Sequence, residues 1–381
     1  MEHRKGVTRI VHLITALEVG GAEMMLYRLL QFLQVHNVEN TVVSLAQVGP
    51  VGKKIQSLGI PVAAIGIKPG TIPSIYRIAK MLRIVKNAQP NILQGWMYHG
   101  NLAANIAQLY CNQRVRLLWN VRQSLGDLQR ERPLTRWVMR ASALLSKSPE
   151  SIIYNSRVSA GQHENFGFAP ENTRFIPNGF DVNQHNQSNS KRREFRREQG
   201  IGEGVFVVGH IARFHPKKDH QTLIEAAHIV AGERSDILFV GVGRGVISDN
   251  AELSGAILSR GLAEKFRLLG ERHDIGRILS SLDLLVLSSA WGEGFPNVLG
   301  EAMAAGVPCV TTDVGESATI VGDSGVVVEV GKPAVLASAI LGYAQMHKVE
   351  REKQGFMARE RIKEHFSIEK IGTEYLALYS R

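Results

Sequence analysis

The chain alternates short apolar runs with longer amphipathic stretches along its whole length. Residues 8–14 and 151–154 form apolar runs of the length of a buried strand, and 22–35 and 74–87 repeat apolar residues at helical spacing. Parallel strands need a crossover connection between them, and that connection is usually a helix. The alternation therefore predicts βαβ units and an α/β fold built on parallel sheets.

The alternation is interrupted once, by the polar and turn-rich segment 178–190, and then restarts. A chain of 381 residues also exceeds the size at which one hydrophobic core keeps growing. We therefore predict two Rossmann-like domains, 1–180 and 191–361, with the helical stretch 362–381 as the candidate to cross back onto the first. The other predicted strands are 40–45, 62–65, 92–93, 116–119, 205–211, 236–240, 266–269, 284–287, 308–311 and 325–328.

Composition and cysteine usage place the chain among ordinary globular proteins. Hydrophobic residues make up 44% of it and charged residues 21%. No apolar run approaches the roughly 18 to 20 residues that span a bilayer, and the run 10–17 is too short and too interrupted for a secretion signal. Cys111 and Cys309 lie far apart and lack the spacing of a zinc site. We expect a reducing, cytoplasmic location.

The positive charge is concentrated in the first half of the sequence. Residues 1–180 hold 21 Lys and Arg against 9 Asp and Glu, a net charge of +12, and residues 181–381 hold 24 against 26, a net charge of −2. Such asymmetry favours an anionic partner for the first half. A phosphate-bearing substrate, an acidic bilayer surface and nucleic acid all satisfy this requirement.

The segment 282–308 combines a predicted buried strand, a polar loop and a predicted helix. Glu293 stands in the loop, and Glu301 stands eight residues later inside the helix. In open α/β sheets the carboxyl ends of the strands bind ligands, and a helix N-terminus there favours anions. The segment therefore predicts a ligand site with two carboxylates. Taken alone, the two carboxylates would be only a charge pair at a helix start.

A second strand-to-helix loop, 211–219, carries Arg213 and Lys218. Arginine offers a planar fork of donors and lysine a compact charge, so the loop suits a diphosphate. Solvated surface charge is the alternative interpretation of this loop taken by itself.

Polar or glycine-rich loops also follow three predicted strands of the first half. Gly20 and Gly21 leave room for a ligand close to backbone N–H groups, although no dinucleotide or P-loop motif is present. His99 and Arg122 follow the next two of these strands. The alternative for Gly20 and Gly21 is a plain tight turn. For His99 it is a helix-capping or partly buried hydrogen-bonded histidine, and for Arg122 it is a surface ion pair.

Together these pieces resemble glycosyltransferase family four, the retaining sugar-nucleotide enzymes with the GT-B fold of two Rossmann-like domains facing a cleft. The resemblance covers nearly the whole chain. The ordered combination of motifs is specific although each motif alone is weak. The matching segments are 20–23, 177–181, Arg213 with Lys218, 270–275, and Glu293 to Glu301 followed by 302–308.

The resemblance implies a set of roles around a sugar-nucleotide donor. Arg213 and Lys218 would hold the diphosphate, Glu301 would accept hydrogen bonds from the ribose, and Glu293 would meet the sugar. His99 is a further catalytic candidate. The residues expected to line the donor are Gly20, Gly21, Arg122, Arg272, Ile275, Gly294, Phe295, Asn297 and Val298.

One position departs from the family pattern. Many members carry a histidine that touches the donor sugar in the loop where this chain has Arg122. The substitution puts the details of sugar contact in doubt, and His99 belongs to an earlier strand end and does not automatically replace that histidine.

The expected chemistry is a dissociative transfer in which negative charge builds on the departing nucleoside diphosphate. Arg213, Lys218 and the helix N-terminus after Glu293 would neutralise this charge. The sequence lacks an Asp-x-Asp triplet for magnesium, so we expect no metal or other cofactor. Glu293 is either a nucleophile or a positioning residue, and the resemblance favours positioning.

The resemblance implies a retaining transferase that moves a hexose or N-acetylhexosamine from a UDP-sugar, or next a GDP-sugar, in surface polysaccharide or glycolipid biosynthesis. The first domain would bind a sugar or lipid-linked sugar acceptor, and its charge predicts peripheral contact with an anionic membrane. No nucleic-acid module is present, so nucleic acid is not expected as a partner. The alternatives are a sugar-nucleotide epimerase of the same fold and a non-catalytic nucleotide- or nucleic-acid-binding protein.

Overall fold

The computed structural model describes residues 7–111, 115–125, 133–183 and 189–381. The chain forms two compact units, one of Met1–Gly179 with Ile368–Arg381 and one of Phe180–Ser367. Each unit has its own parallel sheet with helices on both faces, which confirms the predicted fold class. The predicted linker 178–190 falls partly on 184–188, which lie outside the described residues.

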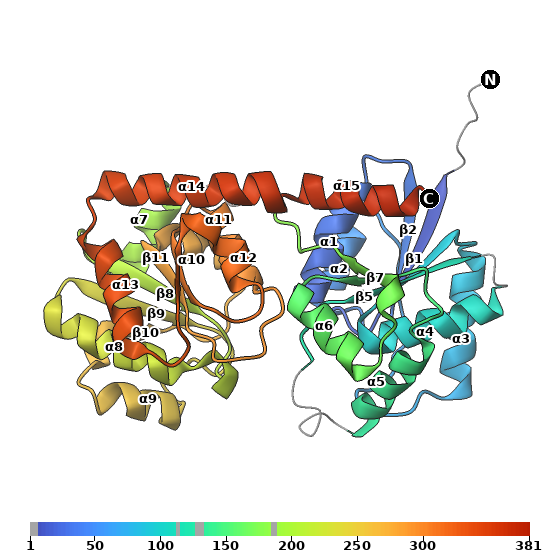
Figure 1. The fold of residues 1–381 in the computed structure, drawn as a ribbon, viewed down its shortest axis with the longest axis horizontal. Coiled ribbons are helices and arrows are strands. Elements are labelled where there is room, and N and C mark those ends of the chain that lie inside the picture. The colour runs from blue at the N-terminus through green and yellow to red at the C-terminus, as the bar shows by residue number, and fades with distance from the viewer. Residues whose placement is uncertain (1–6, 112–114, 126–132, 184–188) are drawn as a thin grey trace. The chain divides into compact units, whose positions relative to one another are not determined.

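The first unit is built on a seven-stranded parallel sheet (Figure 1). In sheet order its strands are β3 (Val62–Ala64), β2 (Val38–Ser44), β1 (Thr8–Ile14), β4 (Ile92–Trp96), β5 (Arg116–Val121), β6 (Ser151–Tyr154) and β7 (Thr173–Phe175). The chain builds outward from β1 in one direction and then from β4 in the other. The order of strands therefore reverses between β1 and β4.

Helices cover both faces of this sheet because side chains alternate along each strand. On β1, Ile10 and Ile14 join one core cluster, and Val11 and Leu13 join the other. The first face is covered by α1 (Gly21–Leu33), α2 (Gly49–Ser57) and α15 (Ile368–Tyr379). The second is covered by α3 (Ile75–Asn87), α4 (Met97–Tyr110), α5 (Pro133–Leu145) and α6 (Arg157–Phe166).

The C-terminal helix α15 belongs to the first unit. The predicted stretch 362–381 began too early, because residues 362–367 belong to the second unit. Helix α15 packs on α1 so closely that a Cβ at Gly372 would lie 2.2 Å from the Phe32 ring. Arg116 binds its end, because its guanidinium donates to the carbonyls of Leu378 at 2.8 Å and Tyr379 at 2.9 Å. A cation at these terminal carbonyls satisfies acceptors that the helix itself leaves open.

A buried polar network fixes the middle of α15. The Tyr375 hydroxyl donates to Asn120 Oδ1 at 2.8 Å and accepts from Arg122 Nη2. Arg122 also donates to the carbonyl of Ile176 at 3.1 Å and to Asn178 Oδ1 at 2.8 Å. Since Tyr375 is fully buried, each of these polar groups depends on the others for its partners.

The second unit is built on a six-stranded parallel sheet. In sheet order its strands are β10 (Phe266–Leu268), β9 (Ile237–Val242), β8 (Phe206–Ile211), β11 (Leu284–Leu287), β12 (Cys309–Thr312) and β13 (Val326–Val328). The helices are α7 (Asn189–Glu198), α8 (His220–Glu233), α9 (Ala251–Leu258), α10 (Ile275–Ser281), α11 (Asn297–Ala304), α12 (Ser317–Val321), α13 (Pro333–Gln345) and α14 (Lys348–Phe366). The strand order reverses here between β8 and β11.

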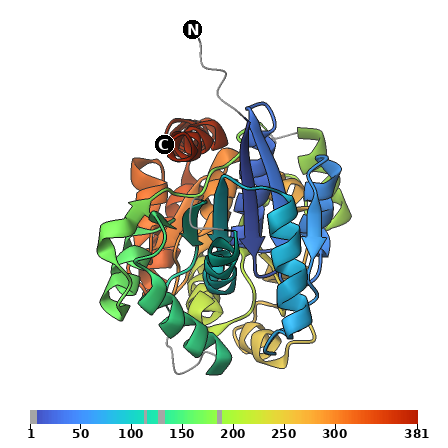
Figure 2. The same cartoon turned by 90° about the vertical axis from the view of Figure 1, so that its right-hand side faces the viewer.

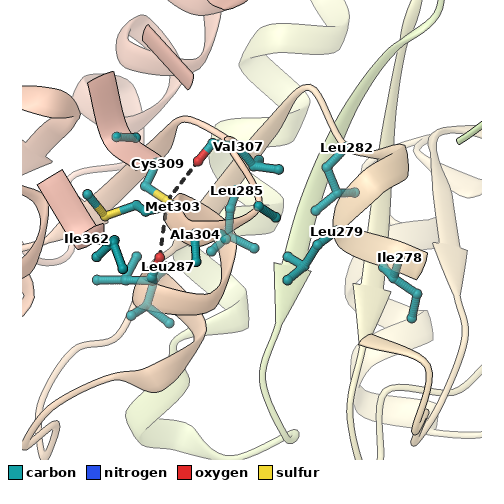
Figure 3. Close-up of a cluster of buried hydrophobic side chains, with 14 of the residues drawn as sticks. Ile278, Leu279, Leu282, Leu285, Leu287, Met303, Ala304, Val307, Cys309 and Ile362 are labelled. Carbon is teal, nitrogen blue, oxygen red and sulfur yellow. Dashed lines mark hydrogen bonds between the residues drawn. The ribbon is translucent and has the colours of Figure 1, made fainter. Parts of the chain in front are cut away.

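Two apolar cores flank the second sheet. Figure 3 shows the one that α10, α11 and α14 cover, where Leu285 and Leu287 of β11 meet Met303 of α11 and Ile362 of α14. The Sγ of Cys309 lies within this core, and burial raises the pKa of its thiol. The other core is covered by α8, α9 and α13. This packing fixes the position of β11 and α11, between which Glu293 lies.

Twelve of the thirteen strands in the described residues lie within a few residues of their predicted positions, and β7 was not predicted. The prediction 92–93 was too short, because β4 continues through Gln94 and Gly95 to Trp96. A polar residue and a glycine weaken the apolar pattern there, whereas in the structure all five residues of β4 are buried. None of the helices in the described ranges combines the length and the apolar composition that crossing a bilayer requires.

The network at Tyr375 gives a testable prediction for stability. Tyr375→Phe removes one hydroxyl that serves both Asn120 and Arg122, and we expect it to lower the free energy of unfolding by about 1.5 to 3 kcal/mol. Urea unfolding followed by circular dichroism measures this change. Tyr76→Phe is the matched control, since Tyr76 is 77% exposed and its loss should cost under about 0.5 kcal/mol. An equal loss in unfolding free energy for Tyr375→Phe and Tyr76→Phe would contradict the role of the Tyr375 hydroxyl in this network.

Candidate functional site

The loops after β8 and β11 leave neighbouring strands at the point where the order of the second sheet reverses. These are the loops for which the sequence predicted ligand-binding residues. In open α/β sheets this reversal opens a crevice at the carboxyl ends of the strands, where ligands bind. The topology therefore brings the two predicted loops together.

An ion pair joins the two loops. Lys218 Nζ, from the loop after β8, pairs with Glu293 Oε1, from the loop after β11. Their side chains are only 15% and 9% exposed. Ser289 Oγ donates to the same carboxylate oxygen at 2.5 Å. Glu293 is therefore in contact with a cation and a hydroxyl in a largely buried place.

Hydrogen bonds hold the backbone on both sides of this pair. Ser288 Oγ lies 3.0 Å from the carbonyl oxygens of both Lys218 and Asp219, and the amide of Ala290 donates to Lys217 at 2.9 Å. The two loops therefore carry the pair on a fixed scaffold.

Asp219 adopts an unusual backbone conformation between Lys218 and α8. Its φ is +47°, in the left-handed region that a residue other than glycine rarely enters. Its side chain offsets this cost by capping α8, accepting from the Thr222 amide at 3.0 Å and the Thr222 hydroxyl at 2.6 Å. The strained turn sets the direction in which the chain leaves Lys218.

The backbone of Glu293 is supported by the loop after β12. Gly315 has a φ of +63°, and a Cβ there would lie 2.4 Å from the carbonyl oxygen of Glu293. The amide of Glu316 donates to the carbonyl of Gly294 at 2.9 Å. Only glycine allows this close approach, so Gly315 is part of what positions the carboxylate.

Helix α11 follows directly and carries the remaining residues predicted for this segment. Asn297 and Val298 are its first two residues and are half-buried, and Glu301 stands one turn later, also half-buried. Phe295 is buried with its ring stacked on Phe180 at 6.1 Å, so only its backbone remains to face a ligand. The N-terminus of α11 is the positive end of the helix dipole and therefore favours an anion.

Three other predicted residues follow β8 or β10 at the same edge of the sheet. Arg213 is exposed on the loop that carries Lys218. Arg272 follows β10 and makes a two-pronged pair with Asp274 at 2.8 and 2.7 Å, and Ile275 begins α10. The guanidinium of Arg272 is therefore already paired with a carboxylate of its own turn.

Sequence reasoning missed two histidines beside Lys218. His210 and His220 pack ring to ring at 4.7 Å, and both are buried. Neither nitrogen of His220 has a hydrogen-bond partner among the described residues, and burial lowers its pKa to about 4. Both rings therefore stay neutral beside the ammonium of Lys218. His220 directly follows Lys218-Asp219, but no spacing distinguished it from a core histidine.

In the first unit, three of the predicted residues lie where that sheet reverses its order. Gly20 is the N-cap of α1 and Gly21 is its first residue, and His99 lies in the first turn of α4, directly after β4. His99 is half-buried, and burial lowers its pKa. No hydrogen bond to its ring occurs among the described residues, so the hydrogen-bonded alternative is not supported.

Arg122 is placed differently from the surface ion pair that the sequence suggested. It is 8% exposed, and its hydrogen-bond partners are the neutral groups of Asn120, Ile176, Asn178 and Tyr375. Burial lowers the pKa of Arg122 to about 9. The surface ion pair is therefore wrong. The guanidinium turns inward and secures α15, a role that depends on contacts some 250 residues away in sequence.

Two family models match the chain and together cover most of it. The model described as Glycosyltransferase Family 4 matches residues 19–184, in the first unit and the start of the second. The model described as Glycosyl transferases group 1 matches residues 205–345, within the second unit.

Similar proteins of known name align with parts of the chain. The N-acetyl-alpha-D-glucosaminyl L-malate synthase of Bacillus anthracis is 31% identical over 189 residues, which are 49% of this chain and 48% of that protein. The UDP-Gal:alpha-D-GlcNAc-diphosphoundecaprenol alpha-1,3-galactosyltransferase of Escherichia coli is 30% identical over 141 residues, 36% of each protein. The matches thus span about half or less of these relatives.

A solved structure similar to the whole chain is that of Anabaena Alr3699/HepE in complex with UDP and glucose. It superposes with a TM-score of 0.85 at 23% identity and covers 98% of this chain and 99% of that one. This likeness concerns the fold.

The ion pair of Lys218 and Glu293 gives a stability prediction. Lys218→Met leaves the Glu293 carboxylate without its cation and should cost roughly 3 kcal/mol in urea unfolding. Adding Glu293→Gln should recover most of that loss, because the buried charge is gone. Lys348→Met is the control, since Lys348 and Glu352 form an exposed pair at 3.7 Å. If the losses in unfolding free energy from Lys218→Met and Glu293→Gln simply added in the double variant, the two residues would not be a coupled buried pair.

Proposed function

The chain belongs to glycosyltransferase family 4, and on that premise we propose that it is a retaining glycosyltransferase. Its donor is a nucleoside-diphosphate sugar, a UDP-sugar first and a GDP-sugar next, that carries a hexose or N-acetylhexosamine. Its acceptor is a sugar or a lipid-linked sugar in surface polysaccharide or glycolipid biosynthesis.

The observation that carries this proposal is the pairing of Lys218 with Glu293 where the second sheet reverses. A cation for a phosphate and a carboxylate for sugar hydroxyls stand in direct contact on two loops that are fixed by hydrogen bonds. A sugar diphosphate needs both groups side by side, because its charged and hydroxylated parts are joined by a single bond.

The charges around this pair suit the departure of a nucleoside diphosphate. As the sugar–phosphate bond breaks, negative charge grows on the leaving diphosphate. Lys218, the exposed Arg213 and the first amides of α11 are the positive groups assigned to it. Because His210 and His220 remain neutral, they add no positive charge to the loop, and the cations assigned to the diphosphate are Lys218 and Arg213.

Glu293 acts in this proposal by positioning the sugar. Its Oε1 already binds the Lys218 ammonium and the Ser289 hydroxyl, and both contacts stabilise negative charge on that oxygen. Stabilised charge makes a carboxylate a weaker nucleophile and leaves it a good acceptor for sugar hydroxyls. The contact geometry therefore supports an attack by the acceptor itself over a covalent intermediate on Glu293.

The names of similar proteins support a UDP-sugar. The Escherichia coli relative is named for UDP-Gal, and the Anabaena structure is described with UDP and glucose. The same Escherichia coli name includes a diphosphoundecaprenol, which supports a lipid-linked acceptor. We assign the donor to the second unit and the acceptor to the first, and the roles of Gly20, Gly21 and His99 stay predictions.

Three substitutions test the separate roles of Lys218, Glu301 and Glu293. Lys218→Ala and Glu301→Ala should weaken UDP binding ten- to a hundredfold, which corresponds to about 1.5 to 3 kcal/mol. Glu293→Ala should suppress sugar transfer more than it weakens UDP binding. Calorimetry with UDP measures the first effect, and turnover of the sugar nucleotide selected from a panel of UDP- and GDP-sugars measures the second.

The control for these variants is Glu352→Ala, which removes a carboxylate whose side chain is 64% exposed on α14. It should leave both binding and turnover unchanged. Unaltered turnover in Glu293→Ala would remove the central assignment. Analysis of the product from a labelled donor distinguishes transfer, with the anomeric configuration kept, from epimerisation.

We also propose that the reaction needs no metal, since cationic side chains and helix amides are assigned to the leaving diphosphate. Excess EDTA should leave the rate of transfer within about twofold of the untreated enzyme. A loss of activity that added Mg²⁺ restores would contradict this part of the proposal.

A further inference from the structure

We propose that the outer surface of α3, α4 and α5 docks onto an anionic lipid bilayer. These three helices cover the same face of the first sheet, and α4 packs against both of the others. Figures 1 and 2 show them next to one another along the first unit. We call this surface the α3–α5 face. It comprises the exposed side chains of the three helices and of Ile72 just before α3.

The α3–α5 face has cations and no carboxylates on its helices. None of the three helices contains an aspartate or glutamate. They contain six Lys and Arg, which are Arg77, Lys80, Arg83, Lys86, Arg136 and Arg140. The wider sequence from 40 to 126 likewise holds ten Lys and Arg and no acidic residue. Such a surface attracts the negative charge of an acidic membrane and has no carboxylates to oppose it.

Large apolar side chains stand exposed among these cations. At the start of α3, Ile72 is 82% exposed, Ile75 is 87% exposed and Tyr76 is 77% exposed. On the other two helices the exposed side chains are Ile106, Leu109, Tyr110, Trp137, Leu144 and Leu145. Single exposed apolar residues are common, but a group of this size on neighbouring helices marks an interaction surface.

The two kinds of side chain are interleaved. In α3 only Met81 and Val85 are buried, so most of the helix surface is free to face a partner. Lys86 Nζ lies 5.5 Å from the centre of the Tyr110 ring, which joins α3 to α4. Basic side chains beside aromatic and aliphatic ones are the composition of helices that lie in the membrane interface, where the cations reach lipid phosphates.

Charge complementarity selects a bilayer over a second copy of the chain. Two α3–α5 faces brought together would oppose six cations to six cations without a carboxylate on the helices to pair with them. An anionic bilayer supplies phosphates for the cations and a hydrocarbon boundary for Ile75, Tyr76 and Trp137. A protein partner would have to be both acidic and apolar over the same area.

The competing basic surface is a groove of about 1550 Å³ in the second unit, between α7 and α14. Arg192 and Arg196 line it, but both are paired with Asp283 at 2.7 and 2.6 Å. Arg193 and Arg197 are exposed at its edge. Its cations are thus partly neutralised within the protein, and it lacks a comparable group of exposed apolar side chains. It serves as the control surface.

Membrane docking deepens the proposed function, because it would bring the acceptor-binding unit to lipid-linked sugars. Its biological purpose therefore rests on the proposed function. Its test is independent of that function. Vesicle binding is measured without donor, and UDP binding is measured without vesicles.

The experiment is co-sedimentation of the full chain with vesicles of phosphatidylglycerol and phosphatidylcholine, or of phosphatidylcholine alone. The protein should bind the anionic vesicles and be released by 0.5 M salt, since the Debye length then falls to roughly 4 Å. Lys80→Glu with Arg83→Glu should weaken binding at least tenfold, because each basic residue near the surface contributes about fivefold. Ile75→Ser with Tyr76→Ser should weaken it without reversing any charge.

The matched control is Arg193→Glu with Arg197→Glu, which makes the same charge change at the groove of the second unit. It should bind vesicles like the unaltered chain. All three double variants should keep the melting temperature and the affinity for UDP, because these side chains are exposed and lie outside the donor loops.

Three results would overturn the proposal. One is binding to neutral vesicles that equals binding to anionic ones. The second is loss of vesicle binding in the groove variant while the α3 variants bind normally. The third is a dimer that dissociates in Ile75→Ser with Tyr76→Ser, without vesicle binding, which would assign the face to a second copy. In each case, retained UDP binding would leave the proposed function standing.

Discussion

The contact between Lys218 and Glu293 is the constraint on which the rest of the proposed donor site depends. The two residues come from loops that are 75 residues apart in sequence, and they meet because β8 and β11 are neighbours in a sheet whose order reverses between them. A buried charge needs a partner. The hydrogen bonds of Ser288 and Ser289, the capped turn at Asp219 and the close approach of Gly315 all act to keep that partner in place. In the proposed function, a site held by these contacts presents its charges to a leaving diphosphate without reorganising.

The sequence predicted most of the fold, because apolar periodicity depends on local residues. The strand 284–287 was predicted with its observed bounds, and the return of the C-terminal helix to the first unit was expected from its pattern. The loops that carry Lys218 and Glu293 were also predicted to bind a ligand, since parallel sheets place ligand sites at the carboxyl ends of strands. That the two residues form an ion pair was not predicted, because the partners of a side chain depend on sheet order.

Arg122 shows what local sequence cannot provide. Its neighbours in sequence suggest a polar loop at a strand end, while its partner Tyr375 comes from the far end of the chain. A buried arginine is stable only when several hydrogen-bond acceptors surround it. The sequence does not reveal that acceptors of Asn120, Ile176 and Asn178 converge at Arg122. His220 escaped prediction for a related reason, since a buried imidazole without partners looks in sequence like any other core histidine.

The most direct test of the proposed donor site is photolabelling of the unaltered chain with an azido-UDP-sugar, followed by peptide mapping. The account predicts label in the segments 213–220 and 289–301, and its loss when unlabelled UDP competes. Label that UDP removes from residues 192–197 or 348–359 instead, with none near Lys218 and Glu293, would contradict the account.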